Sequence, residues 1–225
     1  MARVTKAASD REGNDSGPRR SALLQERSRN TRRRLIRSAL ELWNERGFEE
    51  AFEATTAEEI ARAAGLSKGT FYFHFAHKDD ILLEMSWATA ELMAEEAAEA
   101  MARGIETFGL VEQLMTLLAG RVSQAPRAAV LRVTGHWSKL IHTRSVPTSP
   151  QGFDRVFESV FRYAADRGDL PAAIEAAELA ALLQAATMDA LVGWAATTQS
   201  PAGLRRTLCR RADVILSGAA SSYGG

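Results

Sequence analysis

The sequence predicts an all-α protein, and three observations carry that prediction. Apolar residues recur at helical spacing along most of the 225 residues, and no stretch shows the β-branched alternation of strands. Hydrophobic residues make up 46% and charged residues 25%, as in folded soluble proteins. Gly and Pro separate the helical stretches. Together these observations exclude a sandwich, a barrel and a wholly disordered chain.

Further absences narrow the class of protein. No apolar run approaches the ~18 residues that a membrane span needs, and the polar N-terminus has no apolar signal-peptide core. Cys209 is the single cysteine, which excludes an intramolecular disulfide and a cysteine-based zinc site. We therefore expect a cytoplasmic protein that does not bind the membrane.

The net charge of zero conceals a strong segregation of charge. Residues 1–37 contain 11 Lys and Arg against 4 Asp and Glu, whereas residues 38–101 contain 4 against 14. The first segment is predicted to be a disordered basic arm over 1–26 that leads into a helix. A basic arm fits a nucleic-acid partner, and it is equally compatible with a solvated tail of no function.

The first helix is predicted over about 27–46. Ile36, Ala39, Leu40 and Trp43 recur at helical spacing, and Gly47 ends the helix. The following segment, 49–55, is expected to be a loop.

Two short helices follow. Thr56 and Glu59 have the spacing of a capping box at the start of the first, and Gly65 takes the turn position after it. Ser67 caps the second short helix, which runs from Lys68 to about Phe75. Two short helices joined by a Gly-containing turn and packed on a longer helix form a helix-turn-helix, the unit over 27–77.

A long fourth helix is predicted from Lys78 to about Arg103, with acidic residues in its first turn. It joins this unit to a C-terminal helical domain, so that the second domain spans 78–225. Further helices are expected at 107–122, 126–144, 152–167, 175–198 and 201–217.

The run IARAAGLSKGTFYFHF at 60–75, followed by KDDIL at 78–82, carries a family resemblance. It resembles the signature of TetR-family transcriptional regulators, and the match extends from about Thr31 to Leu83. The resemblance implies a homodimer with two DNA-binding modules and a C-terminal domain that holds a ligand pocket. It also implies double-stranded operator DNA and a small-molecule effector as partners.

The resemblance also assigns DNA contacts, position by position. Thr56 and Tyr72 match phosphate-binding positions, as does Lys78 at the start of the fourth helix. The complete predicted DNA-binding set is Arg32, Arg33, Thr56, Ser67, Lys68, Gly69, Thr70, Tyr72, Phe73, His74 and Lys78. The 49–55 loop is about four residues longer than is usual in the family, and Ala57 cannot donate a hydrogen bond to a base.

Other interpretations remain for some of these residues. Tyr72 and Phe73 are also typical of a helical core. His74 and His77 have a spacing that suits a metal pair, but no third ligand lies nearby, so no metal is predicted. His74 is equally compatible with a helix end that has no DNA role.

The C-terminal domain offers two predicted surfaces. Apolar and polar candidates for a ligand pocket are Trp87, Met115, His136, Trp137, Gln184 and Met188. A helix that is apolar on more than one side suggests a four-helix dimer interface, and the alternative is a central helix that is buried wholly within one chain. The predicted interface residues are Phe153, Phe157, Phe161, Leu179, Leu183, Ala186, Ala190 and Trp194.

The predicted function is sequence-specific transcriptional regulation, by a repressor that a small, largely apolar ligand releases from its operator. The alternative is a ligand-independent DNA-binding activator or architectural protein. No set of nucleophile, base and orienting residue occurs, and no nucleotide loop, so we expect neither an enzyme nor a cofactor.

Overall fold

A computed structural model describes residues 17–44, 47–143, 152–171 and 174–221. The described residues form helices and no strand, as the sequence predicts. The helices are α1 Gly17–Asn44, α2 Phe48–Ala54, α3 Ala57–Ala63, α4 Lys68–His74, α5 Asp79–Ala102, α6 Thr107–Val122, α7 Arg127–Thr143, α8 Phe153–Arg167, α9 Ala176–Ala195 and α10 Pro201–Ser221.

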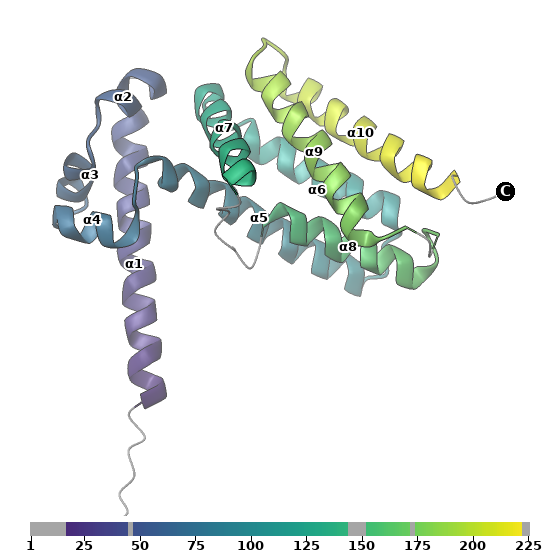
Figure 1. Ribbon diagram of the computed structural model, residues 1–225, viewed down its shortest axis with the longest axis horizontal. Coiled ribbons are helices and arrows are strands. Elements are labelled where there is room, and N and C mark those ends of the chain that lie inside the picture. Colours follow the sequence, from purple (N-terminus) through teal and green to yellow (C-terminus); the bar gives the residue numbers. More distant parts are fainter. Residues whose placement is uncertain (1–16, 45–46, 144–151, 172–173, 222–225) are drawn as a thin grey trace, which may run out of the picture.

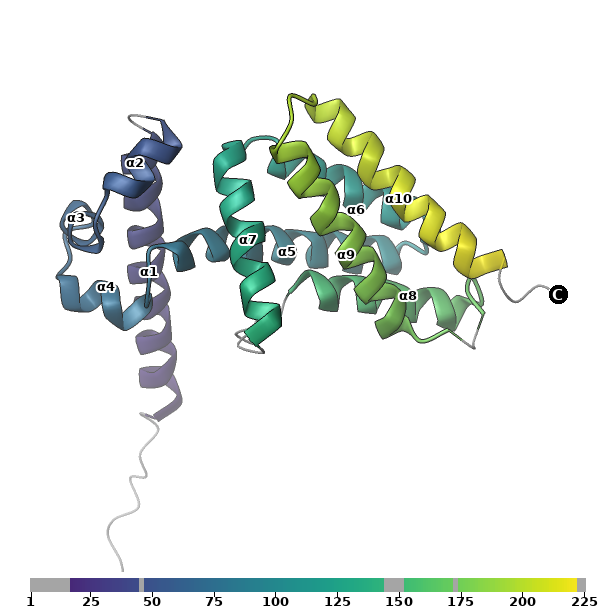
Figure 2. The ribbon, with the colours of Figure 1, turned by 45° about the horizontal axis from the view of Figure 1, so that its top comes forward.

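The helices pack around two hydrophobic cores (Figure 1). The N-terminal core gathers buried side chains of α1 to α4, with Ile81 and Leu82 from the start of α5. The second core begins farther along the same helix, at Ala90, and continues through α6 to α10. One helix thus contributes to both cores, as expected for the fourth predicted helix, and Figure 2 shows it running from the small N-terminal bundle into the larger one.

The first helix is longer than predicted. We expected a disordered arm over 1–26, but α1 begins at Gly17 and projects beyond α3 and α4 in both views. Good helix formers fill the stretch from Ala22 to Arg27, and Pro18 suits a first helical turn. The boundary is therefore wrong for residues 17–26, and residues 1–16 lie outside the described part of the chain.

The segment 49–55 is helical over most of its length, which the sequence analysis missed. Phe48 and Phe52 lie one turn apart on α2, and their ring centroids lie 5.9 and 4.8 Å from that of Trp43 on α1. Phe52 is fully buried. Short helices are not stable alone, so the seven-residue helix α2 depends on the packing of its aromatic side chains on α1.

The remaining predicted helices are confirmed within a few residues of their ends. The capping box of Thr56 and Glu59 is present at α3, and Gly65 has φ +65° in the turn after it. Gly168 likewise ends α8 with φ +75°. These local signals define the helix ends because they satisfy backbone groups that a helix leaves unpaired.

One described helix, α9, is long and apolar enough to cross a membrane by length and composition, with mean hydropathy 1.2. The prediction that no apolar run approaches the length of a membrane span is therefore wrong for α9 by this measure. Eight alanines and only two charged residues, Glu178 and Asp189, produce the high value. In the structure α9 packs on α7, α8 and α10, and buried residues such as Leu183 and Trp194 lie in the C-terminal core.

Candidate functional site

Hydrogen bonds between neighbouring residues fix the start of α4. The Thr70 amide donates to the Ser67 hydroxyl at 3.1 Å, and the two hydroxyl oxygens lie 2.8 Å apart. On the other side of the turn, the Arg34 guanidinium donates to the Ala64 carbonyl at 2.6 Å. A rigid turn holds α4 at a defined angle to α3, as a helix-turn-helix requires.

The faces of α4 differ sharply in exposure. Phe71 and Phe75 are buried at 0% and 2% exposure, whereas Tyr72 and Phe73 are 53% and 81% exposed. The interpretation of Tyr72 and Phe73 as core residues is therefore wrong. Neighbouring large aromatic side chains in water mark a surface that binds something.

Small and basic residues flank these rings. Gly69 is exposed, and a Cβ there would come no closer than 3.7 Å to any neighbour, so the packing does not require a glycine. Lys68 is exposed and pairs with Glu58 across 3.4 Å. The hydroxyl of Thr56 is exposed at the start of α3, where it takes part in the capping box. This surface presents donors, a cation and rings together.

Arg32 and Lys78 do not face outward as predicted. The Arg32 guanidinium pairs with Glu84 and lies 4.6 Å from the Phe75 ring. The Lys78 ammonium donates to backbone carbonyls at the end of α2, including that of Thr55 at 3.1 Å. Both side chains find internal acceptors, so their predicted DNA contacts are corrected to contacts that position helices.

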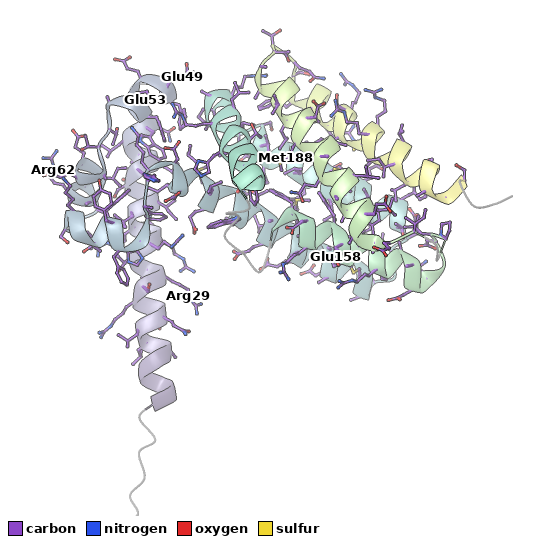
Figure 3. The ribbon with its side chains drawn as sticks, in the orientation of Figure 1. Arg29, Glu49, Glu53, Arg62, Glu158 and Met188 are labelled. Atoms are coloured by element: carbon purple, nitrogen blue, oxygen red, sulfur yellow. The ribbon has the colours of Figure 1, made fainter. Side chains whose placement is uncertain are left out.

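Other arginines of α1 are exposed. Arg33 and Arg37 lie one turn apart, and Arg29 lies one turn earlier on the part of α1 that extends beyond α4 (Figure 3). Residues four apart share a face of a helix, so these side chains form a basic stripe. The sequence analysis included Arg33 in the DNA-binding set, and Arg29 lies in the basic segment 1–37.

His74 ends α4 and is partly exposed. Burial lowers its pKa below the usual 6.5, and the nearby Arg32 charge lowers it further. The imidazole is therefore neutral near pH 7. Among the described residues, no group of three potential ligands is placed to hold a metal ion.

A cavity of about 110 Å³ lies between the two cores. Its lining is almost wholly apolar, and the Trp137 indole Nε1 lies 3.4 Å from the Ser86 hydroxyl on its wall. The remaining lining residues are Leu82, Met85, Thr89, Leu118, Arg121, Val122, Ala125, Ala129, Val130, Val133, Thr134, Phe153, Met188 and Leu191.

Of the predicted pocket residues, Trp137 and Met188 (Figure 3) lie on this wall. The other four do not line it. Met115 is a fully buried core residue of α6, and Trp87, His136 and Gln184 lie elsewhere on their helices. Small residues such as Ala125 and Ala129 make the space, and a search of the sequence for large or polar pocket residues passes over them.

The predicted dimer residues lie within one protomer instead. Phe153, Phe157, Phe161, Leu179, Leu183, Ala190 and Trp194 are all at most 6% exposed in the single chain. Ala186 is partly buried, and its carbonyl accepts a hydrogen bond from Arg211 at 2.6 Å. The seven buried residues are corrected to core positions, because α8 and α9 pack on each other and cover them, whereas the assignment of Ala186 to the dimer interface stays a prediction. The sequence pattern shows that a helix is buried but not which chain buries it.

Comparison with known proteins identifies the protein family. The family model described as "Bacterial regulatory proteins, tetR family" matches residues 35–85. AcrR of Shigella flexneri, an HTH-type transcriptional regulator, is 24% identical over 178 residues, which cover 76% of this chain and 80% of AcrR. The chain is a TetR-family transcriptional regulator.

The fold of this TetR-family regulator agrees with solved structures. Thermus thermophilus FadR, a TetR-family repressor crystallised with lauroyl-CoA, superimposes with TM-score 0.66 at 24% identity, covering 86% of this chain and 100% of FadR. SmeT, repressor of a Stenotrophomonas maltophilia multidrug efflux pump, superimposes with TM-score 0.56 at 19% identity, covering 85% of this chain and 91% of SmeT. As a member of this family the chain is a DNA-binding regulator and not an enzyme.

Proposed function

We propose that this regulator is an operator-binding repressor that a largely apolar small molecule releases from DNA. The exposed face of α4 supports this proposal most directly. Tyr72 and Phe73 stand in water beside Gly69, a residue that the fold itself does not need. A ring packs well on a thymine methyl, a hydroxyl suits a phosphate, and a glycine lets the duplex approach the helix backbone.

The cavity supports the second half of the proposal. Among the described residues that line it, Arg121 alone is charged, and the others are apolar or neutral. An engineered cavity of about 150 Å³ holds benzene, so a cavity of about 110 Å³ accepts a small apolar molecule or part of a larger one. An effector of drug size therefore has to extend beyond this volume or displace part of the wall.

The dimer surface follows from the correction above. Leu182 and Val192 on α9 are 53% and 40% exposed, and Val214 on the adjacent α10 is 67% exposed. We assign the partner protomer to this outer face, where large apolar side chains remain uncovered. Two DNA-binding units then act on one operator, in the cytoplasm where the DNA is.

Recovery of bound duplexes from a random library tests the function, with Phe73→Ala as the site variant and Phe108→Ala as the control. Phe108 is also exposed, at 37%, but lies in the first turn of α6, far from α4 in the sequence. We expect one enriched half-site motif for the wild type and the control, and loss of enrichment for Phe73→Ala. Binding that is equally strong on all duplexes would instead indicate the architectural alternative.

A further inference from the structure

The ring of Phe52 carries two cations. The Lys78 ammonium lies 4.6 Å from the ring centroid, and the Arg132 guanidinium carbon lies 4.3 Å from it. Phe52 belongs to α2, whereas Arg132 belongs to α7 in the C-terminal domain. A cation over a buried ring gains more than at an exposed site, so this contact joins the two domains with some strength.

Acidic groups hold the same guanidinium. Arg132 forms an ion pair with Glu53 on α2, and its other terminal nitrogen lies 3.6 Å from an oxygen of Asp79 in the first turn of α5. The Arg132 side chain is 33% exposed, so water reaches part of the cluster. A single exposed ion pair stabilises little, but a planar guanidinium that contacts two carboxylates and a ring is geometrically constrained.

The helix that carries Arg132 is also a wall of the cavity. Val133 and Thr134 line the cavity on the adjoining positions, as does Val130 two residues before Arg132. Val133 also packs against the N-terminal core. A ligand that enlarges the cavity by pushing on α7 therefore moves Arg132 with it, because a helix shifts as a rigid element.

Contacts continue from Phe52 into the DNA-binding unit. Its ring centroid lies 4.8 Å from that of Trp43, which is fully buried on α1. The Lys78 ammonium on the same ring also binds the carbonyls that end α2. The α2 helix is thus held on one side by Arg132 and on the other by the helix that supports α3.

We infer that Arg132 is a positioning residue that couples the cavity to the DNA-binding unit through α2. The inference rests on the proposed function and adds the route of its regulation. Arg132 on α7 stabilises one placement of α2, and a change in the cavity that displaces α7 breaks the contact with Phe52 and Glu53. Because coupling between two sites is reciprocal, DNA binding must in turn restrain α7.

Reciprocity permits a test that needs no effector. Hydrogen exchange of α7 is measured with and without the duplex recovered from the library, for wild type, Arg132→Ala and Arg132→Lys. The control is Arg162→Ala, which removes an exposed arginine that pairs with Glu158 (Figure 3) on α8. Duplex affinity and melting temperature are recorded for every variant.

In the wild type and the control, we expect the duplex to slow exchange of α7 by about fivefold or more, the lower end of typical allosteric coupling. In Arg132→Ala, duplex binding should persist while this slowing disappears. Arg132→Lys, which keeps the charge but cannot bridge both carboxylates, should retain part of it. If Arg132→Ala does not fold, the lysine variant decides alone, through a smaller slowing than in wild type.

Equal slowing of α7 exchange in wild type and in the folded Arg132 variants would overturn the inference. A wild type that binds the duplex without any slowing of α7 exchange would overturn it as well. A wild type that binds no duplex specifically would refute the proposed function itself. Affinity data therefore separate the two failures.

Discussion

Arg32 on α1 donates a hydrogen bond to the backbone carbonyl of His74, 3.2 Å away, at the end of α4. The same guanidinium pairs with Glu84 on α5. Three helices thus meet at one side chain that faces inward, although it lies beside the exposed Arg33 in the sequence. The position of α4 depends on this contact, because α4 is only seven residues long and short helices are not stable alone.

Arg32 and Arg33 should therefore respond differently to substitution. Arg32→Ala leaves the Glu84 carboxylate, whose side chain is 18% exposed, without its partner, and we expect a loss of about 1–3 kcal/mol in unfolding free energy. Arg33→Ala should leave the urea midpoint unchanged and lower the salt slope of duplex binding by ~1 if it contacts a phosphate. Equal urea midpoints for the two variants would contradict the assignment.

The exposed rings of α4 provide the second prediction. Phe73→Ala and Tyr72→Phe should change stability by less than about 0.5 kcal/mol, as surface substitutions usually do. Phe73→Ala should weaken selected-duplex binding, and Thr70→Ala should reduce discrimination between duplexes. Fluorescence anisotropy titrations on selected and random duplexes measure both effects. Unaltered titrations for both alanine variants would remove α4 from the DNA interface.

Neighbouring leucines on α9 test the corrected dimer surface. Leu182 is 53% exposed and Leu183 is 2% exposed. Leu182→Arg should give a folded monomer, because it places a charge in the proposed interface but not in the core. Leu183→Arg should unfold the protomer, because a charge without a partner in the core costs several kcal/mol. Sedimentation with circular dichroism distinguishes them, and a dimeric Leu182→Arg would move the interface elsewhere.

A fourth prediction concerns acid stability. The buried Thr107 hydroxyl donates to the Asp169 carboxylate at 2.7 Å and lowers the pKa of Asp169, as does its pairing with Arg167. The folded protein thus favours the ionised carboxylate, so its contribution is present above the usual pKa of 3.8 and is lost as the pH falls through the lowered value.

Asp169→Ala should cost about 1–3 kcal/mol at pH 7, because a buried hydroxyl loses its acceptor. Asp169→Asn keeps an acceptor oxygen but cannot titrate. Urea unfolding from about pH 2 to about pH 7 should therefore show a smaller decline at low pH for Asp169→Asn than for wild type. Parallel curves for these two proteins would assign the acid sensitivity to other carboxylates.

Local chemistry made most of the fold predictable. The capping residues Thr56 and Ser67 and the turn glycine Gly65 act within a few residues of themselves, so the sequence alone locates α3 and α4. The exposure of Tyr72 and Phe73 agrees with the DNA contacts that the family resemblance assigns to them.

Contacts between distant segments were not predictable in this way. Lys78 and Arg32 are cations whose acceptors come from other helices, and nothing in their neighbourhood indicates those partners. The helix α2 forms on Trp43 and the cavity exists where small side chains meet, and both depend on tertiary packing. Burial on α9 had the same ambiguity, since a partner chain and a neighbouring helix select the same residues.

The apolar character of α9 also constrains how the chain can be made. Its covered face rests partly on α10, which a ribosome synthesises afterwards. Until α10 emerges, α9 lacks part of its final cover, whereas α1 to α4 and the start of α5 already supply the buried residues of the N-terminal core. The nascent regulator therefore completes its DNA-facing half first, and its most aggregation-prone moment falls between translation of α9 and translation of α10.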